Sequence, residues 1–445
     1  PGGPAVETQR TVRPSTSCTS LRVWGVRIST SYPASASVRA SFQTRWSNGF
    51  RNSRSQITPM RATLAEGDTP KSGRSASGSV RVLMVAPSVR VPDTLGQTLH
   101  QLALAEGLAA QGVAVTLLCR CGTARTENGV RLEPVPDRGL PGERLLFTRL
   151  AAVRVRELLG AGGFDLVHDR GYLFAGAGVR EAARAGVPSV LQIDDNWLRS
   201  ETTASRLART WPYLEAARRS CREQVSLATG GFAVSRTLRQ QAAHWHPDAT
   251  GFAAIQNGYE SERFVPGAEP LGIRERLGLD GPLAVFVGAL GPWHGTDELL
   301  ALARALPRLA VVIAGGGYGL ALPELPNLHH IGRLERADVP RLLAEADLGV
   351  APYPARDYGF SPLKIFEYMG CRLPVVATAL PSVREATAGN ALLTPPGEMA
   401  AGVKRLLDSP GLMDRLGAAG HAFALRERTW ERTVTRTLEL YARFV

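Results

Sequence analysis

Short runs of consecutive apolar residues alternate with helical patterns through most of this chain. The first such unit joins Val80–Pro87 to Val113–Leu118 through a helical segment that opens at Gly96 and ends at Gly112. Uninterrupted apolar runs are typical of parallel strands buried on both faces, because crossover helices cover such a sheet. A strand, a helix and a strand within about forty residues predict a doubly wound α/β sheet.

Composition and charge limit the class of protein. The 445 residues are 44% hydrophobic and 21% charged, which is ordinary for a globular chain of about two or three domains. The formal net charge is +12, but residues 1–79 hold eleven basic and three acidic residues, which leaves only +4 for the rest. This distribution argues against a nucleic-acid partner. No apolar run is long enough to span a bilayer, although peripheral membrane contact stays open.

The first 79 residues differ from the rest. They are rich in Ser, Arg, Thr and Gly and show neither a helical nor a strand period. Because such a segment cannot bury enough apolar surface to order itself, we expect a disordered tail. Its Arg- and Ser-rich composition is similar to that of an organelle transit peptide, which would imply import into an organelle. Alternatively, translation begins at Met60 and residues 1–59 are upstream sequence, which is the interpretation we favour.

The five cysteines give no sign of a disulfide framework or a metal site. Their number is odd, and their spacing contains neither a CxxC pair nor a set of metal ligands. We therefore expect reduced, largely buried thiols in a cytosolic protein that binds no metal.

The stretch 358–377 combines a helix start with a cation and a carboxylate. Ser361 is a good N-cap and Pro362 then falls at the first helical position, so a short helix is predicted from there. Lys364 would lie in the first turn, against the positive end of the helix dipole. Glu367 follows three residues later on the same face. A nucleotide diphosphate with its ribose would use the helix N–H groups, the cation and the carboxylate. The alternative is an ordinary surface Lys–Glu pair.

This stretch resembles the donor-binding helix of retaining glycosyltransferases of family four, which have the GT-B fold. The match is to the branch with Ser-Pro-Leu-Lys, here 361–364, and Pro-Trp-His-Gly, here 292–295. A Val-Ser pair at 234–235 and an Asn-Gly pair at 257–258 extend the resemblance, which runs from about Val80 to the C-terminus.

The resemblance implies two Rossmann-like α/β domains that face a cleft, preceded by the disordered tail. The predicted parts are a tail (1–79), an N-terminal acceptor domain (80–266), a linker (267–281), a C-terminal nucleotide-sugar domain (282–428) and a helix that crosses back to the first domain (429–445).

The predicted donor site lies in the second domain. Glycines between a strand and a helix let backbone N–H groups approach a phosphate. Family members more often carry Arg and Lys on the diphosphate where this chain has Ala289 and His294, so Lys364 is the candidate replacement, with protonated His294 sharing its role. The family's first glutamate would fall at Gly359, which leaves Glu367 as the ribose ligand. The resemblance assigns catalysis to Lys364, His294 and Glu367, and donor binding to Gly96, Gly288, Gly291, His294, Gly295, Gly315, Gly317, Gly332, Arg333, Ser361, Pro362, Leu363, Lys364 and Glu367.

The predicted acceptor site lies in the first domain. The clusters His168-Asp169-Arg170 and Asp194-Asp195 each follow a predicted strand. Because ligands of open α/β sheets bind beyond the carboxyl ends of strands, both clusters are acceptor-site candidates. Alternatively, the Asp–Arg pair is structural and Asp195 caps the next helix.

The resemblance implies transfer of a sugar from a nucleotide-sugar, a UDP- or GDP-sugar, to a hydroxyl of a glycan, lipid-linked or small-molecule acceptor. It also implies retention of configuration and no metal or other cofactor. Catalysis would be mainly electrostatic and positional. Two alternatives remain. A nucleotide-sugar epimerase on the same fold would need acids in the cleft, against which Gly359 argues. A degenerate subunit that binds nucleotide without turnover is kept open by Ala289 and His294.

Overall fold

The structure is a computed structural model that describes residues 22–23, 26–27, 79–92, 96–135, 143–204, 209–291, 293–317 and 322–445. The chain divides into two units, Pro1–Leu64 and Ala65–Val445. Of the first unit, the described residues are β1 (Arg22–Val23) and β2 (Val26–Arg27), which pair antiparallel. The rest of the predicted tail, up to residue 78, lies outside the described residues.

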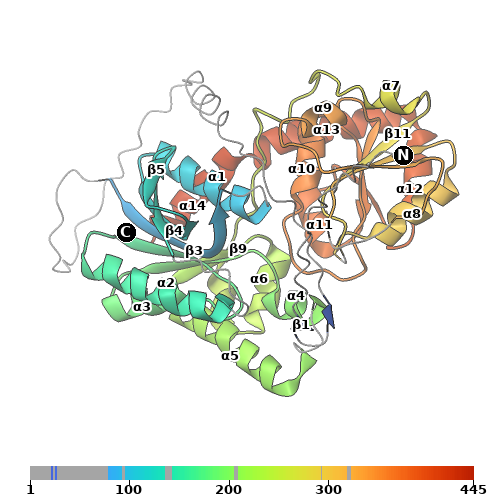
Figure 1. The fold of residues 1–445 in the computed structure, drawn as a ribbon. Helices are drawn as coiled ribbons and strands as arrows, with labels where there is room; N and C mark the ends of the chain where they lie inside the picture. Colours follow the sequence, from blue (N-terminus) through green and yellow to red (C-terminus); the bar gives the residue numbers. More distant parts are fainter. Residues whose placement is uncertain are drawn as a thin grey trace, which may run out of the picture. The chain divides into compact units, whose positions relative to one another are not determined.

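The second unit contains two separate sheets, the first built from residues 81–254 (Figure 1). The order of its eight strands is β10-β9-β8-β7-β3-β4-β6-β5, and all neighbours are parallel except β5 and β6. The strands are β3 (Arg81–Val91), β4 (Ala114–Cys121), β5 (Arg125–Glu127), β6 (Val130–Pro134), β7 (Leu166–Arg170), β8 (Ser189–Ile193), β9 (Gly230–Ala233) and β10 (Ala253–Ala254).

Helices connect these strands in the order that the sequence predicts for a doubly wound sheet. The β3–α1–β4 unit is the predicted strand–helix–strand unit, although β3 continues to Val91, beyond the predicted strand. The helices of this part are α1 (Gly96–Ala110), α2 (Glu143–Gly160), α3 (Ala177–Ala185), α4 (Trp197–Ala204), α5 (Trp211–Leu227), α6 (Arg236–Ala243) and the 3₁₀ helix η2 (Pro247–Gly251).

The second sheet has six strands in the order β13-β12-β11-β14-β15-β16, and every neighbouring pair is parallel. Its strands are β11 (Leu283–Val287), β12 (Ala310–Ala314), β13 (Leu328–Gly332), β14 (Leu348–Ala351), β15 (Val375–Thr378) and β16 (Leu392–Thr394). Its helices are α7 (Ile273–Leu277), α8 (Thr296–Ala305), α9 (Val339–Leu343), α10 (Leu363–Gly370), α11 (Pro381–Thr387), α12 (Met399–Leu407) and α13 (Pro410–Glu427).

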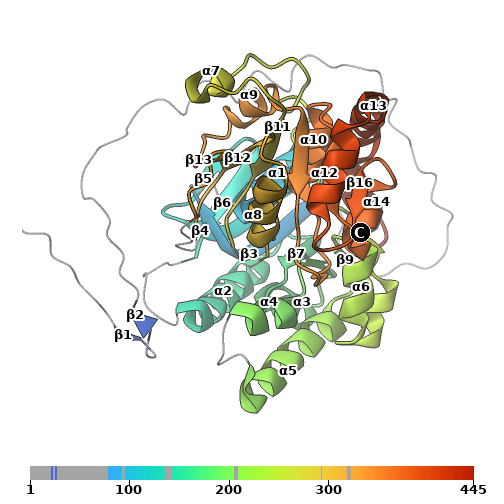
Figure 2. The ribbon, with the colours of Figure 1, turned by 90° about the vertical axis from the view of Figure 1, so that its right-hand side faces the viewer.

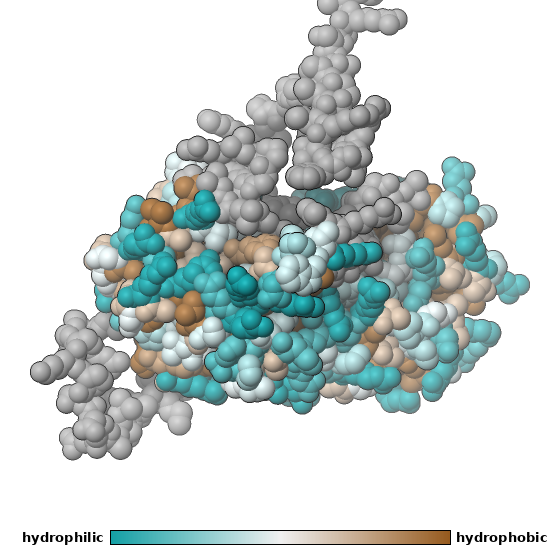
Figure 3. All heavy atoms as spheres, turned by 90° about the horizontal axis from the view of Figure 1, so that it is seen from below, coloured by the Kyte–Doolittle hydropathy of each residue, from teal (hydrophilic) through white to brown (hydrophobic). Residues whose placement is uncertain are grey.

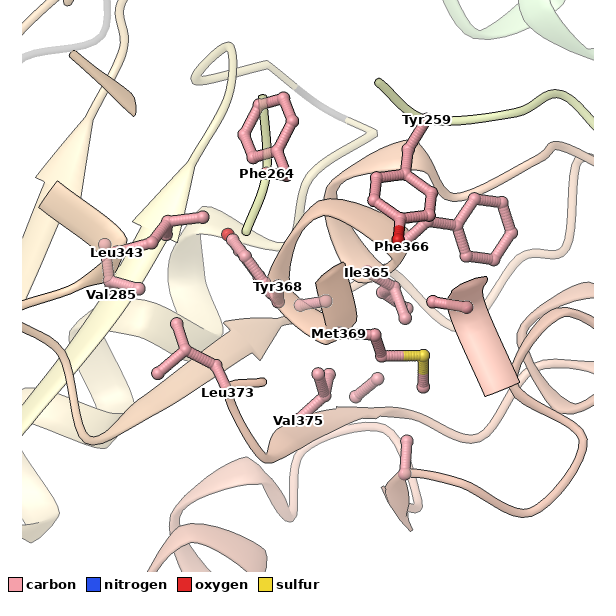
Figure 4. Close-up of a cluster of buried hydrophobic side chains, with 14 of the residues drawn as sticks. Tyr259, Phe264, Val285, Leu343, Ile365, Phe366, Tyr368, Met369, Leu373 and Val375 are labelled. Atoms are coloured by element: carbon pink, nitrogen blue, oxygen red, sulfur yellow. The ribbon is translucent and has the colours of Figure 1, made fainter. Parts of the chain in front are cut away.

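Both faces of the second sheet are covered by helices, as an all-parallel sheet requires (Figures 1 and 2). Successive residues of β11 accordingly enter different cores. Val285 belongs to the cluster on the α10 face, and Phe286 belongs to the cluster on the α8 face. Ile365 and Met369 of α10 point into the first of these clusters (Figure 4). The complete burial of Val285, Ile365 and Met369 fixes α10 against the sheet.

Two connections join the parts of this unit. The helix α14 (Trp430–Tyr441) packs against α1, and Val434 and Tyr441 belong to the core of the first sheet. This is where the sequence placed a helix that crosses back. Residues 267–281 were expected to form a linker, but they include α7. Ile273, at the start of α7, is fully buried in the core of the second sheet.

Candidate functional site

The start of α10 differs from the prediction. The helix begins at Leu363, and Pro362 rather than Ser361 is its N-cap. The predicted side-chain cap is wrong because Pro362 separates the two residues with non-helical φ −85° and ψ 75°. The Oγ of Ser361 is buried and has no hydrogen-bond partner among the described residues. An unpaired hydroxyl therefore lies beside the N-terminus of α10.

Lys364 turns toward the end of β11. Its Nζ lies 3.4 Å from Nδ1 of His294 and 3.9 Å from the ring centroid of Phe286. A methyl group on Gly288 would come within 2.8 Å of the same Nζ, so the ammonium rests against backbone. Within the described residues no carboxylate, Glu367 included, forms an ion pair with Lys364. The alternative of a surface Lys–Glu pair is therefore wrong.

Four of the predicted glycines meet at this edge of the sheet. A methyl group on Gly315 would lie 1.8 Å from the carbonyl oxygen of Gly288, so neither strand end tolerates a side chain there. The N–H of Gly315 donates to the carbonyl of Gly332 at 2.7 Å. Gly295 precedes α8 with φ 56° and packs against Pro352. The carboxyl ends of β11, β12 and β13 thus converge where parallel α/β sheets bind ligands.

A second unpaired hydroxyl lies at the start of α8. The Oγ1 of Thr296, the first residue of that helix, is buried and has no hydrogen-bond partner among the described residues. Buried polar groups are satisfied in most proteins, so unpaired ones need an explanation. His294 links this helix start to Lys364, and Ser361 lies at the other helix start. Two hydroxyls and one cation therefore border the same edge, a set of donors that fits a diphosphate.

The remaining predicted donor residues are less closely tied to Lys364. The carbonyl of Gly291 accepts from the N–H of His294 at 3.0 Å and closes the turn before α8. Gly317 and Arg333 are exposed. Gly96 is exposed at the start of α1, and the preceding residues 93–95 lie outside the described part of the chain. No contact within the described residues joins Gly96, Gly317 or Arg333 to Lys364.

Glu367 has a partner that the sequence did not indicate. Its side chain is almost fully buried, and its Oε1 lies 2.6 Å from a guanidinium nitrogen of Arg336. The Nε of Arg336 also donates to Oε2 of Glu260 at 2.9 Å, and its guanidinium stacks 4.6 Å above the ring of Phe264. Burial raises the pKa of Glu367, and the charge of Arg336 opposes that shift. Arg336 thus holds the carboxylate in one orientation.

Burial at this edge of the sheet shifts the pKa values of Lys364 and His294. Burial lowers the pKa of Lys364 to about 7, with the charge of Glu367 opposing the shift. Burial, together with the charge of Lys364, lowers the pKa of His294 to about 3. His294 is therefore neutral near pH 7 and accepts a hydrogen bond from the ammonium group.

Two predicted acceptor residues are in the wrong place for that role. His168 and Asp169 lie inside β7 rather than beyond its end, and both are fully buried. His168 hydrogen-bonds Tyr441 Oη at 2.5 Å and Gln192 Oε1 at 2.9 Å. Asp169 accepts from the N–H of Val179 at 3.0 Å. Burial lowers the pKa of His168 to about 4 and raises that of Asp169 to about 6. Their contacts are those of core residues.

The other three acceptor candidates lie at the end of the first sheet. Arg170 donates from Nε to Oδ2 of Asp194 at 2.7 Å and from a terminal nitrogen to Oγ of Ser88 at 2.8 Å. Asp195 accepts from Oγ of Ser200 at 3.1 Å, in the first turn of α4. The structure therefore brings Arg170 and Asp194 together. The Oδ1 of Asn196 accepts from the N–H of Arg199 at 3.1 Å, so Asn196 rather than Asp195 takes the capping position of α4.

Two family descriptions match the two sheet-containing parts. "Glycosyltransferase Family 4" matches residues 95–263, and "Glycosyl transferases group 1" matches residues 281–409. The second match includes Lys364, His294 and Glu367. The chain belongs to the family 4 glycosyltransferases. The resemblance seen in the sequence is thereby confirmed.

Relatives of this glycosyltransferase include D-inositol 3-phosphate glycosyltransferases. That of Nocardioides sp. is 27% identical over 401 residues, which cover 79% of this chain and 86% of the relative. That of Salinispora tropica is 28% identical over 408 residues, which cover 79% and 82% of the two chains. The match therefore extends over most of both chains.

Solved structures share the fold of this glycosyltransferase. Sucrose-phosphate synthase from Thermosynechococcus elongatus has a TM-score of 0.68 at 17% identity, covering 82% of this chain and 98% of that one. Anabaena HepE, solved in complex with UDP-glucose, has a TM-score of 0.63 at 18% identity, covering 81% and 99%. The predicted GT-B fold is confirmed. None of the helices in the described part combines the length and apolarity that a membrane crossing requires.

Besides Arg336, the sequence analysis also did not single out His100. His100, in α1 of the first domain, has its pKa lowered to about 3 by burial, with Arg170 and Arg336 adding to the shift and Asp194 opposing it. It is thus electrostatically coupled both to the predicted acceptor pair and to the partner of Glu367. A single histidine in a helical pattern carries no such signal in the sequence.

Proposed function

We propose that this glycosyltransferase takes a nucleotide-sugar donor and transfers the sugar to an acceptor hydroxyl with retention of configuration. A fold neighbour solved with UDP-glucose supports a uridine nucleotide as the first donor to test. The curated relatives are named for D-inositol 3-phosphate, which supports a small polyhydroxylated acceptor rather than a polymer.

One observation carries the donor assignment: Lys364 is a half-buried cation that forms no ion pair within the described residues, and the starts of α8 and α10 each carry a buried, unpaired hydroxyl. Burying an uncompensated charge is unfavourable, so a bound anion would remove that penalty. A diphosphate on Lys364, Ser361 and Thr296 would supply it. The leaving diphosphate gains negative charge in the transition state, so these groups would lower the barrier electrostatically. As proposed, the reaction needs no metal ion.

Glu367 is proposed to accept hydrogen bonds from the ribose hydroxyls. Arg336 would keep the carboxylate ionised and oriented for that purpose. The backbone around Gly315 and Gly332 would hold the base: a side chain at Gly315 would collide with the carbonyl of Gly288, and Gly332 has a left-handed φ of 75° that favours glycine. Among the acceptor candidates, Arg170 and Asp194 are the pair that we propose to meet the acceptor hydroxyls.

The test is calorimetric titration of the full chain with UDP, GDP, UDP-glucose and GDP-mannose, followed by a donor-hydrolysis assay. Lys364→Ala should abolish or strongly weaken binding of the preferred nucleotide. Lys404→Ala removes the same charge from an exposed lysine of the same domain and should bind normally. Wild-type binding by the Lys364 variant would overturn the assignment. Binding without any turnover over a panel of donors would favour the non-catalytic alternative.

A further inference from the structure

A cavity of about 350 Å³ lies between α4, α5 and α6 of the first domain. Arg199 of α4, Arg218 and Arg222 of α5, and His244 after α6 line it, and none of its lining residues in the described part is acidic. Arg218 and Arg222 are one helical turn apart, so they project from the same face of α5. Figure 3 views the molecule from the side that carries α5, where hydrophilic side chains predominate. Because three arginines and no acidic residue line the described cavity, its charge is positive.

The cavity also has an apolar wall. Leu198 and the indole of Trp245 form it, and Trp245 stacks on Trp197 with ring centroids 4.7 Å apart. Trp197 and Trp245 are almost fully buried, so the wall is rigid. Binding sites for small molecules combine such apolar walls with a few convergent polar groups. A ligand here would place a ring or carbon skeleton on the indole and an anionic group among the arginines.

Hydrogen bonds tie the floor of the cavity to the second domain. Gln241 accepts from Asn196 at 2.8 Å and donates to the carbonyl of Asp357 at 3.2 Å. Arg199 donates to the same carbonyl at 3.1 Å. The N–H of Asn196 also donates to the carbonyl of Tyr358 at 3.2 Å. These acceptors lie a few residues before Ser361, at the start of the segment that leads into α10.

We propose that this cavity binds a phosphomonoester of monosaccharide size, and that its occupancy is transmitted to the donor helix through residues 357–358. Guanidinium groups match the oxygens of phosphates and carboxylates in a two-point geometry, and a lining with three arginines favours the larger negative charge of a phosphomonoester. The Nδ1 of His244 donates to the carbonyl of Gln240 at 3.0 Å, so the Nε2 of the ring is the atom that a ligand in the cavity would meet. The site uses none of the residues assigned to the donor.

The first experiment measures binding without nucleotide. Calorimetric titration of the full chain with glucose 6-phosphate, inorganic phosphate and glucose should show saturable binding of the ester, weaker binding of phosphate and none of glucose. The double variant Arg218→Gln/Arg222→Gln should weaken binding of the ester at least tenfold. Arg219→Gln changes an exposed arginine of the same helix that does not line the cavity, and should change affinity less than twofold.

Absence of ester binding would overturn the proposal, as would an equal loss in the Arg219 variant. Melting curves of all variants confirm that the fold survives. Because nucleotide is absent, these outcomes do not depend on the donor assignment, and failure of the Lys364 experiment leaves this site intact.

The second experiment tests the link to the donor side and identifies the source of the ester. Full-length protein is incubated with UDP-glucose and a panel of sugar and polyol phosphates. Incorporation of glucose into one of them identifies it as the acceptor. If an ester is recovered unchanged but alters the rate of donor hydrolysis at least threefold, it is an effector. Both effects should disappear in the Arg218/Arg222 double variant. No effect of any ester on hydrolysis or transfer would overturn the coupling through residues 357–358.

Discussion

The Nζ of Lys364 and Nδ1 of His294 lie 3.4 Å apart, and no carboxylate of the described residues joins them. Because the pKa of His294 is lowered to about 3, the imidazole is neutral throughout the usual assay range and accepts from the ammonium. The expectation that a protonated His294 would share the charge of Lys364 is therefore wrong. Lys364 is left as the cation of this edge, and His294 fixes its direction.

Removing Lys364 should reduce turnover as well as donor binding. We expect Lys364→Ala to reduce donor hydrolysis or transfer by about 10²–10³, the scale observed when one preorganised donor is lost. Lys364→Arg should recover only part of this, because a planar fork does not fit a point-charge site against the Phe286 ring. Steady-state rates under saturating donor provide the measurement, with Lys404→Ala as the matched control. Near wild-type turnover in Lys364→Ala would show that the diphosphate rests elsewhere.

Donor affinity should decrease as pH rises above neutrality. Burial lowers the pKa of Lys364 from 10.5 to about 7, so the free protein loses this charge above that pH. A bound diphosphate raises the pKa again, so binding takes up a proton above pH 7 and is tightest below it. Titrations with UDP-glucose between pH 6 and 9, in two buffers of different ionisation enthalpy, measure both effects. Lys364→Met should show neither proton uptake nor the pH slope; a slope that persists would assign it to another group.

The contribution of His294 should not depend on pH. As a neutral acceptor it supplies one hydrogen bond to Lys364, so His294→Ala should cost about 0.5–1.5 kcal/mol in donor binding. With a pKa of about 3, the imidazole does not change its charge between pH 6 and pH 8. Once each value is expressed relative to wild type at the same pH, the loss should be equal at both. A loss twice as large at pH 6 would mean that the imidazole is charged after all.

Strong periodicity and glycine position explain what the sequence could predict. Buried strands such as β12 (Ala310–Ala314) are continuous apolar runs because both faces are covered, so their pattern has few alternatives. The ends of β11 and β12 carry Gly288 and Gly315, whose backbones approach too closely for any side chain. An overlooked signal was the Asn-Gly pair at 128–129. Both residues have positive φ and join β5 to β6 as a two-residue hairpin.

Contacts between residues far apart in the chain were beyond that reasoning. Arg336 and Glu367 are brought together only by the folded loop after β13, and in a chain so rich in arginine no single one stands out. His168 and Asp169 look like a strand end because polar residues usually mark one. They remain inside β7 because Tyr441 of the last helix and Val179 of α3 supply hydrogen bonds in the core. Tertiary partners, absent from local sequence, decided both cases.

Arg336 should act as a positioning residue for Glu367. In Arg336→Gln the carboxylate loses the charge that opposes its raised pKa, so it should protonate more readily and orient less well. We expect affinity for UDP to fall about tenfold, an effect of about 1.4 kcal/mol, which is close to the lower limit of about 1.5 kcal/mol for a hydrogen bond to a charged group. The difference in affinity between UDP and 2′-deoxy-UDP should become smaller. A variant that only destabilised the fold would not cause this change.

Two further variants make that test specific. Glu367→Ala should weaken UDP binding by about 1.5–3 kcal/mol and abolish the difference in affinity between UDP and 2′-deoxy-UDP. Arg341→Gln, in which an arginine paired with Asp338 is changed, should leave UDP binding unaffected. If Arg336→Gln preserved full ribose discrimination, its ion pair with Glu367 would be only a structural link between the donor helix and the 260–264 segment.

Gly359 should not accept the glutamate that other family members carry. It has φ 73°, its carbonyl accepts from Oγ of Ser235 at 3.0 Å, and a Cβ would lie 2.7 Å from Cβ of Leu238. A left-handed non-glycine residue costs about 1–2 kcal/mol, and overpacking adds about 1–3 kcal/mol. Gly267→Ala is the matched control, with φ 77° but no atom within 4 Å of the new methyl group. Gly359→Ala should therefore lower the melting temperature more than Gly267→Ala, and Gly359→Glu should lower it further without raising turnover. Higher donor hydrolysis in Gly359→Glu would mean that the contact between Leu238 and residue 359 opens to admit the carboxylate, and that this position is catalytic after all.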